Sequence, residues 1–283
     1  MTEFPIPVVG LGPGSQGGDE GLELIGSPGE MAVFAPPRVS DNASAAVRAA
    51  ALEELLALRD AMRATDFARG LTRDMRGLTP AVRALVNEAL GEGEVAITVQ
   101  GPGRLRVQET VFAGVWRVLR DATDGQPAVD RVEAGAMPAA VIDAARAGTV
   151  RQATALAQPA GVMNAPAILA ELNEHAATRL PHAPAHIVNL TLLPVTPEDL
   201  AWLGDCLGFG AVAILSRGYG NCRITSTGLR DTWWVQYFNS TDKLILNTLE
   251  VTRVPDVAPA AEEDYLDSIE RLGEWIDALR EEQ

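Results

Sequence analysis

The chain has 283 residues, 47% of them hydrophobic, and could bury the core of one large domain or of two small ones. It carries 23 basic and 38 acidic residues, a formal net charge of −15, and no lysine- or arginine-rich stripe, so nucleic acid is not an expected partner. The two cysteines are too few for a disulfide framework. The sequence does not start with a basic segment followed by an apolar signal stretch. No apolar run approaches the roughly 20 residues that are needed to cross a bilayer. We therefore expect a cytoplasmic protein without direct membrane insertion.

Residues 1–43 are rich in glycine and proline and show neither helical nor strand periodicity, which predicts an extended N-terminal arm. A few large apolar residues, such as Phe4 and Phe34, indicate that part of this arm lies across a surface. Residues 44–64 then place leucines at helical spacing, with Asn42 and Ser44 as capping residues. This pattern predicts the first helix.

One sequence pattern occurs twice. Thr79–Pro138 aligns with Thr196–Pro255 without a gap. The identical positions include paired glycines, Arg106 with Arg223, and Trp116 with Trp233. Because low-complexity composition does not place tryptophan, arginine and paired glycines in register, we interpret the pattern as an internal duplication.

Each copy has the same predicted elements. A Thr-Pro pair starts a helix that a Gly-x-Gly segment ends, because threonine caps the first turn and proline needs no N–H there. Two hairpins follow, about four mostly antiparallel strands in each copy. A proline then ends the last strand, and a helix follows it: Ala139–Ala147 in the first copy and Ala260–Arg280 in the second.

We therefore predict an α+β fold built as a tandem repeat behind the N-terminal arm. Residues 44–147 form the first repeat unit with its preceding helix, and residues 148–185 form a linker that contains a helix from about Pro166 to Leu180. Residues 186–283 form the second unit, in which the segment HIVNLTLLPV predicts an added strand and the C-terminal helix is acidic.

The most distinctive segment is RGYGNCRI, residues 217–224, in the predicted hairpin turn of the second copy. Glycines allow a tight turn and close approach of another chain, and tyrosine, arginine and tryptophan anchor protein interfaces. Adjacent strand residues face opposite sides, so at least one ring of the nearby tryptophan pair should pack in the core and the other is left for solvent or a partner. The candidate partner-binding residues are Arg217, Tyr219, Asn221, Cys222, Arg223, Trp233 and Trp234. The alternative is that the glycines only satisfy turn geometry.

Cys222 is a weak candidate for metal, cluster or redox chemistry. It lies in the predicted turn beside Arg217 and Arg223, which would favour its thiolate. The first copy has Leu105 at this position, so the fold does not require a thiol, and a small turn residue without chemistry is the alternative. Cys206 lies on a predicted helix and is expected in the core.

No cofactor, metal site or enzymatic activity is predicted. His175, His182 and His186 could bind zinc or nickel, but Pro184 disrupts the helix that would present the last two at i, i+4, and no Cys, Asp or Glu neighbour completes a set. The sequence also contains no Gly-x-Ser-x-Gly segment, recognisable carboxylate pair or histidine-based triad.

Several segments resemble one known family. LTLLPVTPEDLAWL (190–203), RGYGNCRITSTGLRDTWWVQYFNS (217–240) and DKLILNTLEV (242–251) are similar to the C-terminal region of the HupH/HyaF/HoxQ hydrogenase expression/formation proteins. GPGSQ (12–16) and MNAPAILAE (163–171) are also similar to that family. The first copy departs from the pattern, since it has GPGRLRV in place of GYGNCRI and a single tryptophan in place of the pair.

The resemblance implies an accessory chaperone in [NiFe]-hydrogenase maturation, not a catalyst. Its implied partner is the precursor of the iron–sulfur small subunit, held during cluster assembly or protection before export, and a thioredoxin-like accessory protein is a further implied partner. Two alternatives stay open: a transient iron–sulfur or redox carrier that uses Cys222, and an adaptor between other accessory proteins.

Overall fold

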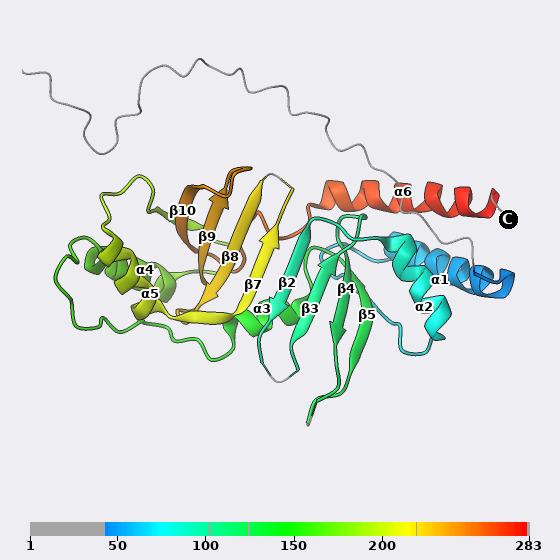
Figure 1. Cartoon of the computed structure of the whole chain (residues 1–283), viewed down its shortest axis with the longest axis horizontal. Helices are drawn as coiled ribbons and strands as arrows, with labels where there is room; N and C mark the ends of the chain where they lie inside the picture. The colour runs from blue at the N-terminus through cyan, green and yellow to red at the C-terminus, as the bar shows by residue number, and fades with distance from the viewer. Residues whose placement is uncertain (1–42, 102, 124, 219, 282–283) are drawn as a thin grey trace, which may run out of the picture. The chain divides into compact units, whose positions relative to one another are not determined.

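A computed structural model describes residues 43–281 apart from 102, 124 and 219 (Figure 1). The predicted N-terminal arm therefore lies, except for its last residue, outside the described residues, and so does Tyr219. The helices are α1 (Ala45–Ala64), α2 (Pro80–Leu90), α3 (Ala139–Arg146), α4 (Ala165–Thr178), α5 (Pro197–Leu207) and α6 (Glu262–Glu281). None of these helices combines the length and the apolar character that crossing a membrane requires.

The strands form one sheet in which every pairing is antiparallel. In chain order they are β1 (Leu71–Asp74), β2 (Val95–Val99), β3 (Leu105–Glu109), β4 (Val115–Arg120), β5 (Val129–Ala134), β6 (His186–Asn189), β7 (Phe209–Ser216), β8 (Asn221–Thr227), β9 (Thr232–Phe238) and β10 (Leu244–Val251). Their order in the sheet is β1-β5-β4-β3-β2-β7-β8-β9-β10-β6. The α+β class is thus confirmed, and the added strand exists as β6.

Local sequence explains where the helices of the two Thr-Pro segments begin and end. Thr79 accepts a hydrogen bond through its side chain from the Val82 N–H at the start of α2, and Thr196 accepts one from the Asp199 N–H at the start of α5. Gly91 and Gly208 follow the last residues of these helices at φ of 59° and 62°, a region that glycine enters without strain.

The first half of the sheet has one strand more than the four predicted, whereas the second half has the four predicted strands and the added strand. The described chain has five on each side of the β2–β7 pairing. In each half the first strand in the sequence pairs with the last, β1 with β5 and β6 with β10. The sequence indicated β6 but not β1, whose four residues, LTRD, are too short and too polar to show a strand pattern.

Helices cover the two faces of the sheet unequally. On one face, α3 packs over the centre, where Val141 joins the core that contains Trp116 and Trp233. On the other face, α4 and α5 lie over one end with Trp234 in their core, whereas α1, α2 and α6 lie at the opposite end. Figure 1 shows these two helix groups at the left and right, with β8, β7, β2 and β3 between them.

Candidate functional site

The strands between the two helix groups present a strip of side chains on the face that also carries Trp234. Directly opposed residues of antiparallel strands point to the same face. The observed register joins Trp234 to Thr225, Thr225 to Ala213, Ala213 to Thr98 and Thr98 to Arg106. Since side chains alternate along a strand, Arg223 shares the face of Thr225. One surface therefore runs across β3, β2, β7 and β8.

Arginines give this strip a basic character. Arg104, Arg106 and Arg223 are exposed, and the Arg104 Nη2 donates a hydrogen bond to the Thr98 Oγ1 at 3.3 Å. We call Thr98, Arg104, Arg106, Ala213 and Arg223 the basic strip. Arg106 lies 3.4 Å from Asp121 in an ion pair whose two side chains are solvated, which neutralises it weakly. In a chain of net charge −15, these exposed arginines make the strip a candidate anion-binding surface, with the exposed Glu94 at its border beside the β7–β8 turn.

The β7–β8 turn lies beside the basic strip. The Arg217 N–H donates to the Glu94 carbonyl at 3.2 Å, which ties the turn to the start of β2. The Asn221 Nδ2 donates to Asp242 Oδ1 at 3.3 Å, which joins this turn to the β9–β10 turn. Of the candidate contact residues, Arg217 and Arg223 are exposed and Asn221 is half-buried, whereas Tyr219 lies outside the described residues.

The side chain of Arg223, which follows the β7–β8 turn and belongs to the basic strip, packs on the ring of Phe238. The Cζ of Arg223 lies 4.5 Å from the ring centroid of Phe238, within the range of a cation–π interaction. This contact leaves the guanidinium N–H groups available for an anionic partner, because the ring occupies only one face of the planar group.

The tryptophan pair does not contribute an exposed ring, and that expectation is corrected. Trp233 and Trp234 point to opposite faces of β9 as predicted, but they are only 1% and 9% exposed. The Trp233 indole N–H donates to the Thr252 carbonyl at 3.2 Å and that of Trp234 to Asn247 Oδ1 at 2.6 Å. Both faces of the sheet are covered at β9, and the face that carries Trp234 is covered by α4 and α5. Both rings are therefore core residues.

Cys222 is not in the turn, and the prediction of a favoured thiolate is wrong. It lies in β8 and is 2% exposed. Its side chain points into the core on the opposite face of the sheet from the Arg223 side chain. Burial raises the pKa of the Cys222 thiol to about 11, and the charge of Glu250 adds to this, although a hydrogen bond with Tyr237 acts in the other direction. The group is therefore a neutral thiol at physiological pH.

Cys206, expected in the core, is half-buried on α5 and packs against the core around Trp202. Its Sγ accepts a hydrogen bond from the Leu156 N–H at 3.4 Å. Its role is to pack α5 against the segment that precedes α4.

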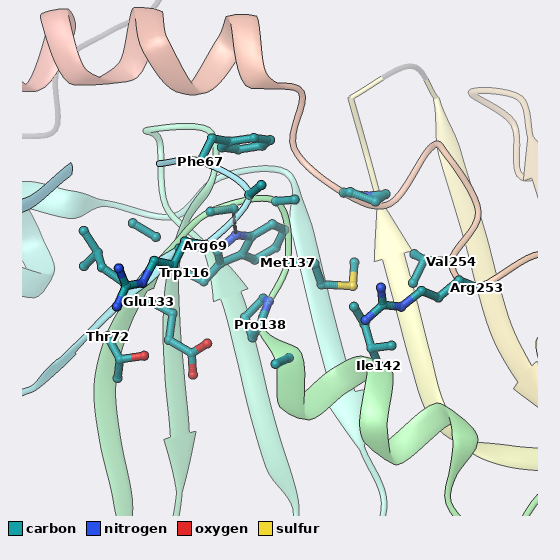
Figure 2. Close-up of a pocket in the computed structure, with 18 residues that line it drawn as sticks. Phe67, Arg69, Thr72, Trp116, Glu133, Met137, Pro138, Ile142, Arg253 and Val254 are labelled. Carbon is teal, nitrogen blue, oxygen red and sulfur yellow. Dashed lines mark hydrogen bonds between the residues drawn. The ribbon is translucent and has the colours of Figure 1, made fainter. Parts of the chain in front are cut away.

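A pocket of about 570 Å³ opens on the face of the sheet that carries Trp116 (Figure 2). Figure 2 shows Arg69 and Arg253 on opposite sides, with Trp116 and Met137 between them. The Trp116 indole N–H is fixed by a 2.9 Å bond to the Gly135 carbonyl, and the lining residues include no His, Cys, Ser or Lys. Its polar lining side chains are Arg69, Thr72, Glu133 and Arg253.

The fold and these surfaces define an α+β protein whose single antiparallel sheet presents an exposed, arginine-bearing face. The family model described as "HupH hydrogenase expression protein, C-terminal conserved region" matches residues 47–157 and 162–279. The chain therefore belongs to the HupH hydrogenase expression/formation family.

Relatives of known name agree with this assignment. The chain is 45% identical to the hydrogenase expression/formation protein HoxQ of Cupriavidus necator over 99% of this chain and 100% of that protein. It is 46% identical to HupH of Rhodobacter capsulatus over the same shares, and 32% identical to the hydrogenase-1 operon protein HyaF of Escherichia coli over 96% of each chain. A solved structure of HupH from Thiobacillus denitrificans is 28% identical, with a TM-score of 0.39, over 41% of this chain and 96% of that one.

Proposed function

We propose that this protein is an accessory chaperone in [NiFe]-hydrogenase maturation. In this proposal it binds the iron–sulfur small subunit precursor in the cytoplasm, during cluster assembly or protection before export. Membership of the family supports the role in hydrogenase maturation, since the relatives are hydrogenase expression/formation proteins. The observation that carries the binding role is the basic strip, an accessible cationic surface on an otherwise acidic protein.

The chemistry of the strip favours a partner segment that carries carboxylates. Arginine forms two parallel hydrogen bonds with a carboxylate and is enriched among the residues that dominate interface energies. The negative charge elsewhere on the chain repels an acidic segment from other surfaces, so the charge distribution orients the partner toward Arg104, Arg106 and Arg223. Arg217 and Asn221 extend the surface along the β7–β8 turn, and Tyr219 remains a proposed contact residue of that turn.

We also infer that the scaffold is an internal duplication. Matched residues of the two copies make matched contacts: the Trp116 indole N–H donates to the Gly135 carbonyl, and the Trp233 indole N–H donates to Thr252, the residue aligned with Gly135. The hydroxyls of Thr110 and Thr227 each bond to the carbonyl and the N–H of the residue two positions later. The family model also matches two successive segments of the chain.

Under this inference, both copies contribute residues to the basic strip. Arg106 and Arg223 are aligned residues, and the β2–β7 pairing brings their strands onto one face. The first unit then contributes to the same binding surface as the second.

The alternative role of a redox or iron–sulfur carrier is not favoured, since the Cys222 thiol is buried among apolar residues. An adaptor role, for example toward a thioredoxin-like accessory protein, would use the same surface with a different partner.

Recovery of the precursor from cells that express both proteins tests the proposal. We expect the wild-type protein to recover the small subunit precursor, and the triple variant Arg104→Glu, Arg106→Glu and Arg223→Glu to lose most of it. A matched triple of exposed arginines outside the strip serves as the control for charge: Arg63→Glu, Arg151→Glu and Arg280→Glu. Equal recovery by the two triple variants would remove the strip from the proposal, and no recovery by the wild type would remove the chaperone role.

A further inference from the structure

We propose that Glu171, His175 and His186 form a binding site for a divalent transition-metal ion. This inference does not depend on the proposed function. Glu171 and His175 are four residues apart on α4 and therefore lie on the same side of the helix. His186 is the first residue of β6, the edge strand beside β10. The site would join the helix of the linker to the edge of the sheet.

The three side chains already converge. One potential ligand atom from each residue lies within 4.8 Å of the other two. The His186 Nε2 is 2.7 Å from Glu171 Oε1, and the rings of His175 and His186 stack with centroids 3.4 Å apart and planes at 6°.

His175, His182 and His186 are the three candidate ligands in the sequence, but no acidic neighbour is expected to complete a metal site. Pro184 does prevent His182 and His186 from sharing a helix, as expected, and His182 sits in a turn at φ of 64° outside the cluster. The expectation that no acidic neighbour completes a set is wrong. The chain folds back after α4, so that His186 meets Glu171 and His175 from the preceding helix.

Two imidazoles and one carboxylate are a donor set typical of Zn²⁺ and the neighbouring first-row ions, whereas Mg²⁺ and Ca²⁺ prefer oxygen ligands. Bonds of roughly 2.0–2.1 Å in a tetrahedron place ligand atoms about 3.3 Å apart. Binding therefore lengthens the 2.7 Å contact between Glu171 and His186 and turns the two rings out of their parallel stack.

The surroundings permit this rearrangement. The side chains of His186 and Glu171 are 29% and 44% exposed and His175 is half-buried, so all three residues have solvent on one side. Three protein ligands also leave a fourth position open for water or for a ligand atom of another molecule, as at catalytic and exchangeable sites. An ion at this position would fasten α4 to β6 and stabilise the folded state by mass action.

Titration calorimetry with Zn²⁺ on the full-length protein without a histidine tag tests the site. We expect one ion per chain, a higher melting temperature in Zn²⁺, and no such binding of Mg²⁺. His186→Ala and Glu171→Gln should each weaken Zn²⁺ binding by more than the roughly 10- to 100-fold that removal of a supporting residue around a metal site costs. His182→Asn should bind as the wild type does, since asparagine tolerates the positive φ of that turn.

Visible absorption of the Co²⁺-loaded protein gives a second measurement that reports ligand type directly. His175→Gln is a third variant that leaves the edge strand intact, and circular dichroism shows which variants are folded. Absence of stoichiometric Zn²⁺ binding in the wild type would overturn the proposal. Unchanged affinity in a folded His186→Ala or His175→Gln variant would also overturn it and leave a simple hydrogen bond between Glu171 and His186.

Discussion

Asp199 is predicted to be the polar residue on which the α4–α5 corner depends most. Its side chain is fully buried. Oδ1 accepts hydrogen bonds from the backbone N–H groups of Met163, Asn164 and Ala165 at 2.7, 3.0 and 3.0 Å, and Oδ2 accepts one from Thr196 at 3.0 Å. One carboxylate thus caps the first turn of α4 and completes the capping box of α5.

The effect of Asp199→Asn follows from these four bonds. The amide nitrogen cannot accept, so at least one buried N–H loses its partner, at about 1–3 kcal/mol, and the remaining bonds lose charge assistance. We expect a total loss of roughly 3–5 kcal/mol in the free energy of unfolding. At about 2–4 °C per kcal/mol for a domain of this size, the melting temperature falls by roughly 6–20 °C.

The charge of Asp199 also predicts a pH dependence. Burial raises its pKa, but the four backbone N–H groups together lower it further, to about 2 from the usual 3.8. Because the folded-state pKa is depressed, the stabilisation is present above about pH 4 and is lost as the pH falls through 2. The Asn variant should lack this part of the acid sensitivity.

Thermal and urea unfolding of the wild type and of Asp199→Asn measure both effects. Asp205→Asn is the matched control, since Asp205 is an exposed aspartate on the same helix. If Asp199→Asn and Asp205→Asn unfold within about 1 °C of each other, the capping role assigned to Asp199 is refuted.

Three further predictions concern two buried groups. Burial raises the pKa of Glu109 to about 7, and the charges of Glu94 and Asp264 contribute less. The protonated side chain therefore stabilises the folded state below pH 4.5, and this stabilisation is lost as the pH rises through 7. Glu109→Gln should therefore raise the melting temperature at pH 8, by an amount equivalent to about 3 kcal/mol, and not at pH 4. Equal gains at both pH values would contradict this. Cys222 should resist iodoacetamide in the native protein at pH 7.5 and react once the chain is unfolded, as followed by mass spectrometry. Cys222→Ser should recover the precursor as the wild type does, and loss of recovery from a folded variant would restore a role for the thiol.

The elements that the sequence predicted well are those with local causes. The helix after Ser44 and the two helices after Thr-Pro follow from capping residues and apolar spacing. The hairpins follow from alternation around glycine turns, and β6 from its β-rich segment. The joining of the two halves through β2 and β7 has no comparable local signal, because it depends on strands more than a hundred residues apart.

The candidate site was predicted only in part, for a related reason. Arg223 was identified as a surface residue because its type and its place beside a glycine turn are local properties. The burial of Trp234 depends on α4 and α5, which pack over β9 from elsewhere in the chain. The sequence places Cys222 in the turn because it follows the glycines closely, whereas its burial depends on the β7–β8 register, which pairs it with the buried Ser216. Arg104 was missed, since only the register shows that it lies on the face of Arg223.

Photocrosslinking in cells tests the central claim that the basic strip binds the small subunit precursor. A photoreactive phenylalanine analogue replaces Ala213, an exposed strip residue between the arginine-bearing strands, and in a control variant it replaces Glu274, which is exposed on α6. We predict a crosslink to the precursor from position 213 and none from position 274. A crosslink from 274 alone, or none from 213 in a folded protein, would contradict the claim.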